Sequence, residues 1–283
     1  MSSTSGRLYH QTKELEGLHT QVFVEGDPKH TTVLLIHGAT VAAWEFNQLV
    51  EASLTRGFHC IRYDLFGHGL SSKPYKKLNR ALLINQACDI VDQYCTRQPF
   101  ILLGHSLGGA IASQLAVARK EQVERLILLA PMLNFVRTSF IARLLSRPSL
   151  GKIFMQVIGR HYLRQRRHKR LNAMGLPELK IQFDEAYYSE GYWQSMQALF
   201  QSGALGCQHS TYLKLGQERL MTQILWGKLD TVIPEAHIVA IDKLLEVNPF
   251  HQKALYLSHS EHNFVLTQAG RICQLVFSEN AGI

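Results

Sequence analysis

The sequence predicts an α/β protein built on a mainly parallel sheet, with helices on both faces of the sheet and one helical insertion. Short apolar runs bounded by turn residues recur along the chain, and stretches with helical spacing of apolar residues separate them. A stretch without such a run, 134–215, interrupts this alternation. The 283 residues are 46% hydrophobic and 18% charged, enough for one large α/β domain with an insertion or for two small domains.

The expected strands are short, apolar and without alternation, as is typical of strands buried on both faces of a sheet. In chain order they are 33–36, 58–63, 100–103, 126–129, 224–226 and 254–257. The opening segment, 8–25, is interpreted as a strand or hairpin at the edge of the sheet. Since parallel neighbours need crossover connections, the segments between these runs should pack on the faces of the sheet.

Three helices are expected between these strands. Apolar residues recur at helical spacing in 79–95, whereas 108–119 is small and apolar nearly all round, as expected of a helix buried against a sheet. The segment 234–247 is amphipathic and opens with Pro234, which suits the first turn of a helix. These segments complete the alternation of strand and helix.

The interrupting stretch contains helical pieces at 140–145 and 153–163. We interpret 134–215 as a helical cap inserted between the two parts of one core, 1–133 and 216–283. A cap of this kind would cover the active site, so that some of its side chains would line the substrate pocket.

The central motif is Gly104-His105-Ser106-Leu107-Gly108, which fits the pattern G-x-S-x-G where an expected strand ends and a helix begins. The motif needs a sharp turn, and glycine at positions 104 and 108 removes side chains that would collide with the adjoining strand and helix. The turn lifts the Ser106 hydroxyl above the sheet, at the positive end of a helix. The amide of Leu107 then points to where negative charge develops on an attacked carbonyl oxygen. We expect Ser106 to be an accessible nucleophile.

With further stretches in the same order, the sequence resembles the α/β-hydrolase family, in its cap-bearing group of serine esterases, lipases and carbon–carbon hydrolases. These stretches are His37-Gly38-Ala39, Asp64-Leu65-Phe66-Gly67-His68-Gly69-Leu70-Ser71, Trp226-Gly227-Lys228-Leu229-Asp230-Thr231-Val232-Ile233-Pro234 and Ser258-His259-Ser260-Glu261-His262-Asn263-Phe264. The resemblance implies a mostly parallel eight-stranded sheet with a helical cap. It also implies that Ala39 supplies a second oxyanion amide and that Asp64 shapes the floor of the active site without being catalytic.

A serine hydroxyl needs an adjacent base, and a carboxylate must orient that base. In this family the chain order is serine, acid, histidine. Of the 14 histidines, only His259 and His262 follow the last expected strand; the family's position is His262, and His259 is the alternative. Asp230 follows a strand and precedes a helix, which makes it the expected acid, although an aspartate there can also cap a turn. The family usually has glycine immediately before the histidine, whereas this chain has Glu261.

These residues predict a serine hydrolase that cleaves a carboxylic ester through an acyl-enzyme. One alternative is a carbon–carbon bond hydrolase acting on an acidic diketone, and another is a low-turnover ligand-binding protein on the same fold. A serine in the motif disfavours dehalogenases and epoxide hydrolases, which resemble this scaffold but use aspartate there. The mechanism requires no metal or organic cofactor, and the sequence has no P-loop or dinucleotide fingerprint.

The expected partner is a small-molecule substrate with an apolar portion, because the insertion is rich in apolar side chains. These are Phe135, Phe140, Ile141, Leu144, Leu145, Ile153, Phe154, Met155, Val157, Tyr188, Trp193, Met196, Leu199 and Phe200. The net charge is +8, and basic residues are dense between Arg137 and Arg170. This cluster suits a solvated face, an anionic substrate or weak contact with an anionic membrane surface, but the charge alone does not indicate nucleic-acid binding.

The chain is expected to be cytoplasmic. No window approaches the ~18–20 apolar residues of a membrane-spanning helix, and the polar segment 1–17 lacks the apolar part of a secretory signal. The five cysteines form an odd, scattered set without C-x-x-C spacing, which favours small buried hydrophobes over a disulfide framework or a zinc site. They are Cys60, Cys88, Cys95, Cys207 and Cys273.

Overall fold

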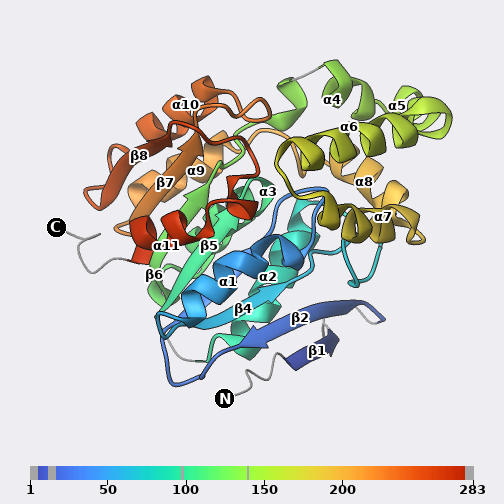
Figure 1. Cartoon of the computed structure of the whole chain (residues 1–283). Coiled ribbons are helices and arrows are strands. Elements are labelled where there is room, and N and C mark those ends of the chain that lie inside the picture. Colours follow the sequence, from blue (N-terminus) through green and yellow to red (C-terminus); the bar gives the residue numbers. More distant parts are fainter. Residues whose placement is uncertain (1–5, 12–16, 97–98, 139, 278–283) are drawn as a thin grey trace.

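The computed structural model describes residues 6–11, 17–96, 99–138 and 140–277, and its centre is an eight-stranded sheet in the order β1-β2-β4-β3-β5-β6-β7-β8 (Figure 1). Strands β3 to β8 are parallel, whereas β2 pairs antiparallel with both β1 and β4. The strands are β1 (Gly6–Gln11), β2 (His19–Glu25), β3 (Thr32–Ile36), β4 (His59–Tyr63), β5 (Phe100–His105), β6 (Val123–Leu129), β7 (Met221–Gly227) and β8 (His251–Leu257). The expected mostly parallel eight-stranded sheet is confirmed.

The two ends of the sheet differ from its buried centre. The opening segment forms the antiparallel pair β1–β2 at one edge, as expected, although residues 12–16 lie outside the described part of the chain. At the other edge, the expectation that 254–257 is buried on both faces is wrong, since Leu255 is 37% exposed. The reason is that β8 has a neighbouring strand on one side only, and its apolar run faces partly toward solvent.

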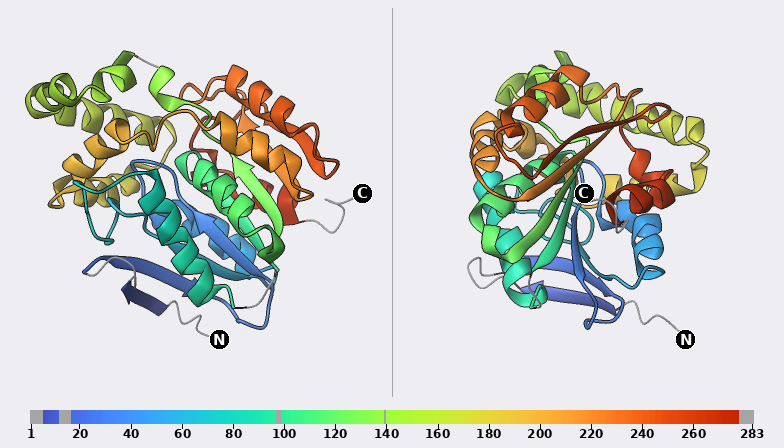
Figure 2. Two further views of the ribbon diagram at one scale, coloured as in Figure 1. Left: turned by 180° about the vertical axis from the view of Figure 1, so that it is seen from behind. Right: turned by 90° about the vertical axis from the view of Figure 1, so that its left-hand side faces the viewer.

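Helices cover both faces of the sheet (Figure 2). On one face α1 (Asn47–Leu54) packs against α11 (Ala269–Phe277); on the other, α2 (Arg80–Tyr94), α3 (Leu107–Ala118), α9 (His209–Gln217) and α10 (Glu235–Leu245) form a layer. The Asn79 side chain caps α2 by accepting a hydrogen bond from the Leu82 amide at 2.9 Å. Helix α10 begins one residue later than expected, because Pro234 has extended backbone angles and precedes the first turn.

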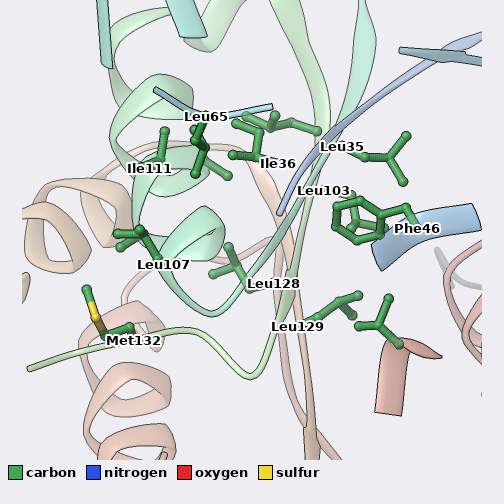
Figure 3. Close-up of a cluster of buried hydrophobic side chains, with 14 of the residues drawn as sticks. Leu35, Ile36, Phe46, Leu65, Leu103, Leu107, Ile111, Leu128, Leu129 and Met132 are labelled. Atoms are coloured by element: carbon green, nitrogen blue, oxygen red, sulfur yellow. The ribbon is translucent and has the colours of Figure 1, made fainter. Parts of the chain in front are cut away.

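The core beneath α3 is a continuous apolar cluster. Figure 3 shows Leu107 and Ile111 of α3 in the same cluster as Ile36 of β3, Leu103 of β5 and Leu128 of β6. Each of these side chains is at most 2% exposed. Burying a side chain of this size stabilises the fold by about 1.5–3 kcal/mol. The helix that follows Ser106 is therefore held firmly on the sheet.

Between β6 and β7 the chain forms a run of helices. They are α4 (Phe140–Leu145), α5 (Pro148–Phe154), a π-helical segment (Met155–Gly159), α6 (Arg160–Ala173), α7 (Lys180–Tyr188) and α8 (Tyr192–Gln201), followed by α9. The expected helical piece 140–145 coincides with α4, but 153–163 extends over three elements. Helices α4 to α8 lie together at one end of the molecule, whereas α9 packs on α3 and α10 (Figure 1). The boundaries of a cap at 134 and 215 stay a prediction.

Short 3-10 turns complete the description: η1 (Ala43–Phe46), η2 (Lys120–Gln122), η3 (Phe135–Arg137), η5 (Pro177–Leu179) and η6 (Phe264–Leu266). Among the helices that the structure describes, none combines the length and apolar character needed to span a bilayer. All five cysteines are free thiols; three are buried, Cys88 is half-buried, and Cys207 is exposed rather than packed in the core.

Candidate active site

Ser106 occupies the turn between β5 and α3, in a backbone conformation that non-glycine residues rarely adopt. Its φ is 54° and its ψ is −112°, a strain that typically costs about 1–3 kcal/mol. The predicted role of the two glycines is confirmed: a Cβ on Gly104 would lie 2.3 Å from the Gly108 carbonyl oxygen, and one on Gly108 would lie 2.0 Å from the Ile36 carbonyl oxygen. The strand, the turn and the helix can approach each other this closely only because both positions lack a side chain.

The Ser106 hydroxyl is the first member of a chain of three side chains. His262 Nε2 lies 3.1 Å from Ser106 Oγ, and His262 Nδ1 lies 2.7 Å from Asp230 Oδ2. The structure therefore brings together Ser106, His262 and Asp230, as the sequence predicted. The alternative residue His259 is exposed, and no contact joins it to Ser106 in the described part of the chain.

Backbone contacts hold the Asp230 and His262 loops against each other. A Cβ on Gly227 would lie 2.3 Å from the Ser260 carbonyl oxygen, and this same oxygen accepts a hydrogen bond from the Leu229 amide at 2.9 Å. Asp230 Oδ1 accepts from the amides of Val232 and Ile233 at 2.7 and 2.9 Å, which leaves Oδ2 for His262. The acid is thus oriented before any substrate binds.

Glu261, which replaces the family's usual glycine, joins the loop of His262 to helix α6. Its Oε2 accepts from Arg170 Nε of α6 at 3.1 Å, while the neighbouring His262 keeps its contacts to Ser106 and Asp230. The departure from the family pattern therefore leaves the histidine in reach of the serine.

Burial and the adjacent charges set the protonation of the site. Burial lowers the pKa of His262 below its ordinary 6.5, although the neighbouring Asp230 carboxylate acts in the opposite direction. For Asp230, burial alone would raise the pKa, but the charge of His262 and the hydrogen bonds to the carboxylate outweigh it, so that the pKa is lowered. At neutral pH the site consequently holds a neutral imidazole beside an ionised carboxylate, as a general base requires.

The expected oxyanion residues flank the serine. Leu107 is the first residue of α3, so its amide has no partner within that helix. A Cβ on Gly38 would lie 3.4 Å from Ser106 Cβ, which places the turn containing Ala39 directly beside the serine. His37 stabilises this turn: its Nδ1 donates to the Gly38 carbonyl oxygen at 2.7 Å, and its Nε2 accepts from the Leu65 amide at 2.9 Å. Leu107 thus adjoins Ser106 in sequence, and Ala39 lines the same cavity as the serine.

Ser106 faces a cavity of about 260 Å³ rather than the outer surface. The serine is only 8% exposed, so the expected access to it runs through this cavity. Of the apolar residues singled out in 134–215, those that line it are Phe135, Ile141, Leu145, Met155, Trp193, Met196, Leu199 and Phe200. Others point to solvent, among them Phe140, Ile153, Val157 and Tyr188. The cavity lies between the carboxyl edge of the sheet and helices α4, α6, α7 and α8.

The sequence did not reveal a buried pair of charges beneath the triad. His105 Nδ1 lies 2.9 Å from Glu45 Oε1, and both side chains are inaccessible to solvent. His105 Nε2 donates to the His262 carbonyl oxygen at 3.0 Å, while Glu45 Oε2 accepts from the Gly38 amide at 3.0 Å. Burial opposes both charges, yet the two groups act on each other strongly enough to raise the pKa of His105 and lower that of Glu45. The pair connects the oxyanion turn to the histidine loop.

Asp64 has the structural role that the resemblance implied. Its carboxylate accepts hydrogen bonds from the Ala43 amide at 2.8 Å and from the Leu70 amide at 2.9 Å. These bonds hold together the segments that contain Ala43 and Leu70, and Asp64 is not among the residues that line the cavity of Ser106. Among the described residues, no group of three histidine, cysteine, aspartate or glutamate side chains is arranged to hold a metal ion.

Comparison with known proteins places this geometry among hydrolases. The chain is 27% identical over 226 residues to an uncharacterized protein of Mycobacterium tuberculosis. The aligned part covers 72% of this chain and 63% of that protein, so the chain spans less than two thirds of this relative's length. It is 34% identical over 100 residues to a 2-hydroxymuconate semialdehyde hydrolase of Pseudomonas sp., covering 34% of this chain and 35% of that enzyme.

The fold is similar to that of 2-hydroxy-6-oxo-6-phenylhexa-2,4-dienoate hydrolase from Rhodococcus sp. strain RHA1, with a TM-score of 0.77, 19% identity, and coverage of 97% of this chain and 98% of that one. The family model described as "Serine aminopeptidase, S33" matches residues 27–263, a span that runs from before β3 to the loop of His262. The chain therefore belongs to the serine aminopeptidase S33 family of α/β hydrolases.

Proposed function

We propose that this protein is a serine hydrolase that cleaves a carboxylic ester, with Ser106 as nucleophile, His262 as general base and acid, and Asp230 as the group that orients His262. The observation that carries the proposal is the pair of contacts that joins the three side chains, 3.1 Å from Ser106 Oγ to His262 Nε2 and 2.7 Å from His262 Nδ1 to Asp230 Oδ2. Both distances are within hydrogen-bond reach, and the serine faces a cavity.

The reaction follows from this geometry in two steps. Ser106 Oγ attacks the carbonyl carbon of the ester while His262 Nε2 takes the hydroxyl proton; the leaving alcohol then receives that proton, and an acyl-enzyme remains. Water attacks the acyl-enzyme, gives its proton to His262, and releases the carboxylic acid as Ser106 recovers its proton. The amides of Ala39 and Leu107 would hold the negative oxygen in both steps.

The cavity supports a small or medium substrate with an apolar portion. Its volume of about 260 Å³ lies slightly below the ~300–1,000 Å³ that ligand sites usually have. Apolar side chains from α4 and α8 line much of it, including Leu145, Met196 and Leu199. An acyl chain could pack against these residues while its carbonyl lies beside Ser106.

A carbon–carbon bond hydrolase acting on an acidic diketone is the second candidate. It is favoured by the names of two similar proteins, a 2-hydroxymuconate semialdehyde hydrolase and a 2-hydroxy-6-oxo-6-phenylhexa-2,4-dienoate hydrolase. The arginines that line the cavity, Arg166, Arg167 and Arg170, would also suit an acidic substrate. A third candidate, a ligand-binding protein of low turnover, would retain the fold without using the triad.

Labelling with a fluorophosphonate probe tests the nucleophile. We expect intact-mass analysis to show one adduct on the wild type and none on Ser106→Ala, because the probe reacts with an activated serine. Nitrophenyl esters of graded acyl length would then report the depth of the cavity, and a vinylogous diketone would test the second candidate. A wild-type protein that binds ligands yet takes up no probe would contradict the enzyme and favour the binding protein.

The matched control for the base is the exposed neighbour His259. His262→Ala should reduce kcat for the preferred ester by about a thousandfold or more, as with other triads. His259→Ala should leave kcat nearly unchanged. The reverse pattern would overturn the assignment of His262.

A further inference from the structure

Arg167, in the middle of α6, projects into the same cavity as Ser106. Its guanidinium lies 4.4 Å from the centre of the Phe183 ring, and its Nη2 donates to the hydroxyl of Thr40. Thr40 directly follows the expected oxyanion residue Ala39, so this contact brings the positive charge close to the place where a scissile carbonyl would bind. Tyr187 and Tyr192 also line the cavity.

No carboxylate in the described part of the chain lies within ion-pair distance of Arg167. The charges of the two other arginines of the cavity are compensated, one by a carboxylate and one by water. Arg170 contacts Glu261 at 3.1 Å, and Arg166 is exposed to water. Glu45 is the one acidic residue that lines the cavity among those described, and it is already occupied by His105 at 2.9 Å. Arg167 is consequently a half-buried cation with no carboxylate at ion-pair distance among the described residues, although the charge of the more distant Glu45 also acts on it.

Such a charge is costly to maintain in a folded protein. A buried cation is normally paired, because losing its hydration without compensation destabilises the fold. A guanidinium stays charged at neutral pH, even where burial lowers its pKa as it does for Arg167. Aromatic rings and one hydroxyl compensate only part of the lost hydration. The planar fork of the guanidinium is suited to a carboxylate or phosphate, which it can bind through two parallel hydrogen bonds.

We propose that Arg167, assisted by Thr40, binds an anionic group of the substrate, so that the substrate is an ester carrying a carboxylate or phosphate group a few bonds from its scissile carbonyl. The proposal rests on the proposed function, since it names the class of substrate for the same site. The anion would complete the charge balance of the cavity while the apolar side chains hold the rest of the acyl chain.

The same charges disfavour a substrate with a free amino group. An aminopeptidase must bind a positively charged N-terminus, for which a carboxylate is the natural partner. The described residues that line this cavity offer three arginines and a glutamate that His105 already occupies. The charge of the site therefore opposes the reaction that the family description names.

Paired substrates test the anion site. We compare kcat/KM for nitrophenyl hexanoate with that for the mono-nitrophenyl ester of adipic acid, which has the same chain length and a terminal carboxylate. The wild type should prefer the adipate ester by about 10- to 100-fold, the usual effect of a hydrogen bond to a charged group. A phosphonate-terminated ester of matched length then distinguishes phosphate from carboxylate recognition.

Substitution should remove this preference selectively. Arg167→Met should bring the ratio of the adipate rate to the hexanoate rate near one, whatever change is common to both rates, and Arg167→Lys should retain part of the ratio. The matched control is Lys169→Gln, an exposed change of equal charge on the same helix that lies outside the cavity. An undiminished ratio in Arg167→Met, or no preference in a wild type that cleaves hexanoate, would overturn the anion site alone.

A binding measurement separates the anion site from catalysis. Free adipate should raise the thermal unfolding midpoint of the wild type and of Ser106→Ala, but not that of Arg167→Met, because a ligand stabilises the state that binds it. The shift in the unfolding midpoint is expected even if the protein cleaves no ester. Absence of ester cleavage would contradict only the proposed function. An equal shift in wild type and Arg167→Met would contradict the anion site.

Discussion

His262 is buried between a hydroxyl and a carboxylate, and its environment determines the pH range in which the site can act. Burial lowers its pKa from 6.5, so the imidazole is neutral at pH 7 and is protonated only when the pH falls below that lowered pKa. Because the protonated form cannot accept the Ser106 proton, activity is present above this pKa and is lost below it.

We therefore expect kcat/KM to be flat near neutral pH and to decline on an acid limb with a midpoint below 6.5, falling about tenfold per pH unit beyond it. The measurement is a pH–rate profile with a neutral nitrophenyl ester, whose own charge does not change. A midpoint at or above the ordinary histidine value would contradict the assigned base or its burial.

The buried pair formed by Glu45 and His105 lies next to the triad but takes no part in the proposed reaction steps. Replacing the acid by an uncharged isostere, Glu45→Gln, leaves His105 enclosed without its counter-charge. We expect the free energy of unfolding at neutral pH to fall by about 3–5 kcal/mol, as when other buried pairs lose one partner. Urea unfolding measures this change, and the exposed Glu51→Gln in α1 is the matched control. A loss as small as that of the control would show that the pair contributes no stability.

At the scale of elements, the turn at Ser106 depends on how closely α3 approaches β3. Ala in place of Gly108 would put a Cβ 2.0 Å from the Ile36 carbonyl oxygen, a contact between backbone groups that neither element can relieve alone. Gly108→Ala should therefore lower the free energy of unfolding by at least about 1–3 kcal/mol and reduce activity, because the elbow has to widen.

The matched control is Gly270→Ala in α11, where a Cβ would meet no atom within 4 Å. There the substitution should be neutral or stabilising by up to about 1 kcal/mol, since alanine favours helix. Chemical denaturation of both variants measures the difference. Equal effects at the two positions would indicate that the elbow tolerates a wider turn.

The elements and the triad could be predicted from sequence because each has a local signature. Buried strands are continuous apolar runs, and the serine turn needs glycine at fixed positions; once the family resemblance is established, chain order identifies Asp230 and His262. Glu45 has no such signature, since it lies in a short 3-10 turn far from His105 in sequence, and only the sheet brings the two together. The exposure of β8 was missed for a related reason: an edge position depends on strand order rather than on composition.

At the scale of the molecule, α4, α5 and the π-helical segment after them lie at one end (Figure 1), and they carry exposed apolar side chains as well as basic residues. Phe140 of α4 is 73% exposed, Ile153 of α5 58% and Val157 of the π-helical segment 75%. The basic residues Arg143 and Lys152 lie on α4 and α5. This combination favours weak binding to an anionic membrane surface, because apolar side chains enter the interface and basic groups contribute about 1 kcal/mol each.

Co-sedimentation with vesicles tests this contact, which stays a prediction. Binding should be stronger to vesicles with phosphatidylserine than to purely zwitterionic ones, and should weaken with salt. Val157→Ser should reduce it, whereas Ile181→Ser, an equally exposed apolar position on α7, should not. Equal loss in both variants, or no dependence on lipid charge, would contradict a surface formed by α4, α5 and the π-helical segment that contains Val157.

The ion pair between Arg170 and Glu261 joins α6 to the loop that carries His262, so the position of one affects the position of the other. Glu261 immediately precedes His262, so a rotation of α6 away from the sheet must separate the guanidinium from the residue next to the base. The pair is partly exposed, and such pairs contribute only about 0–1 kcal/mol, so thermal motion can break it. A rotation of α6 that widened the cavity would therefore break this ion pair, and the pair would form again only with α6 against the loop of His262.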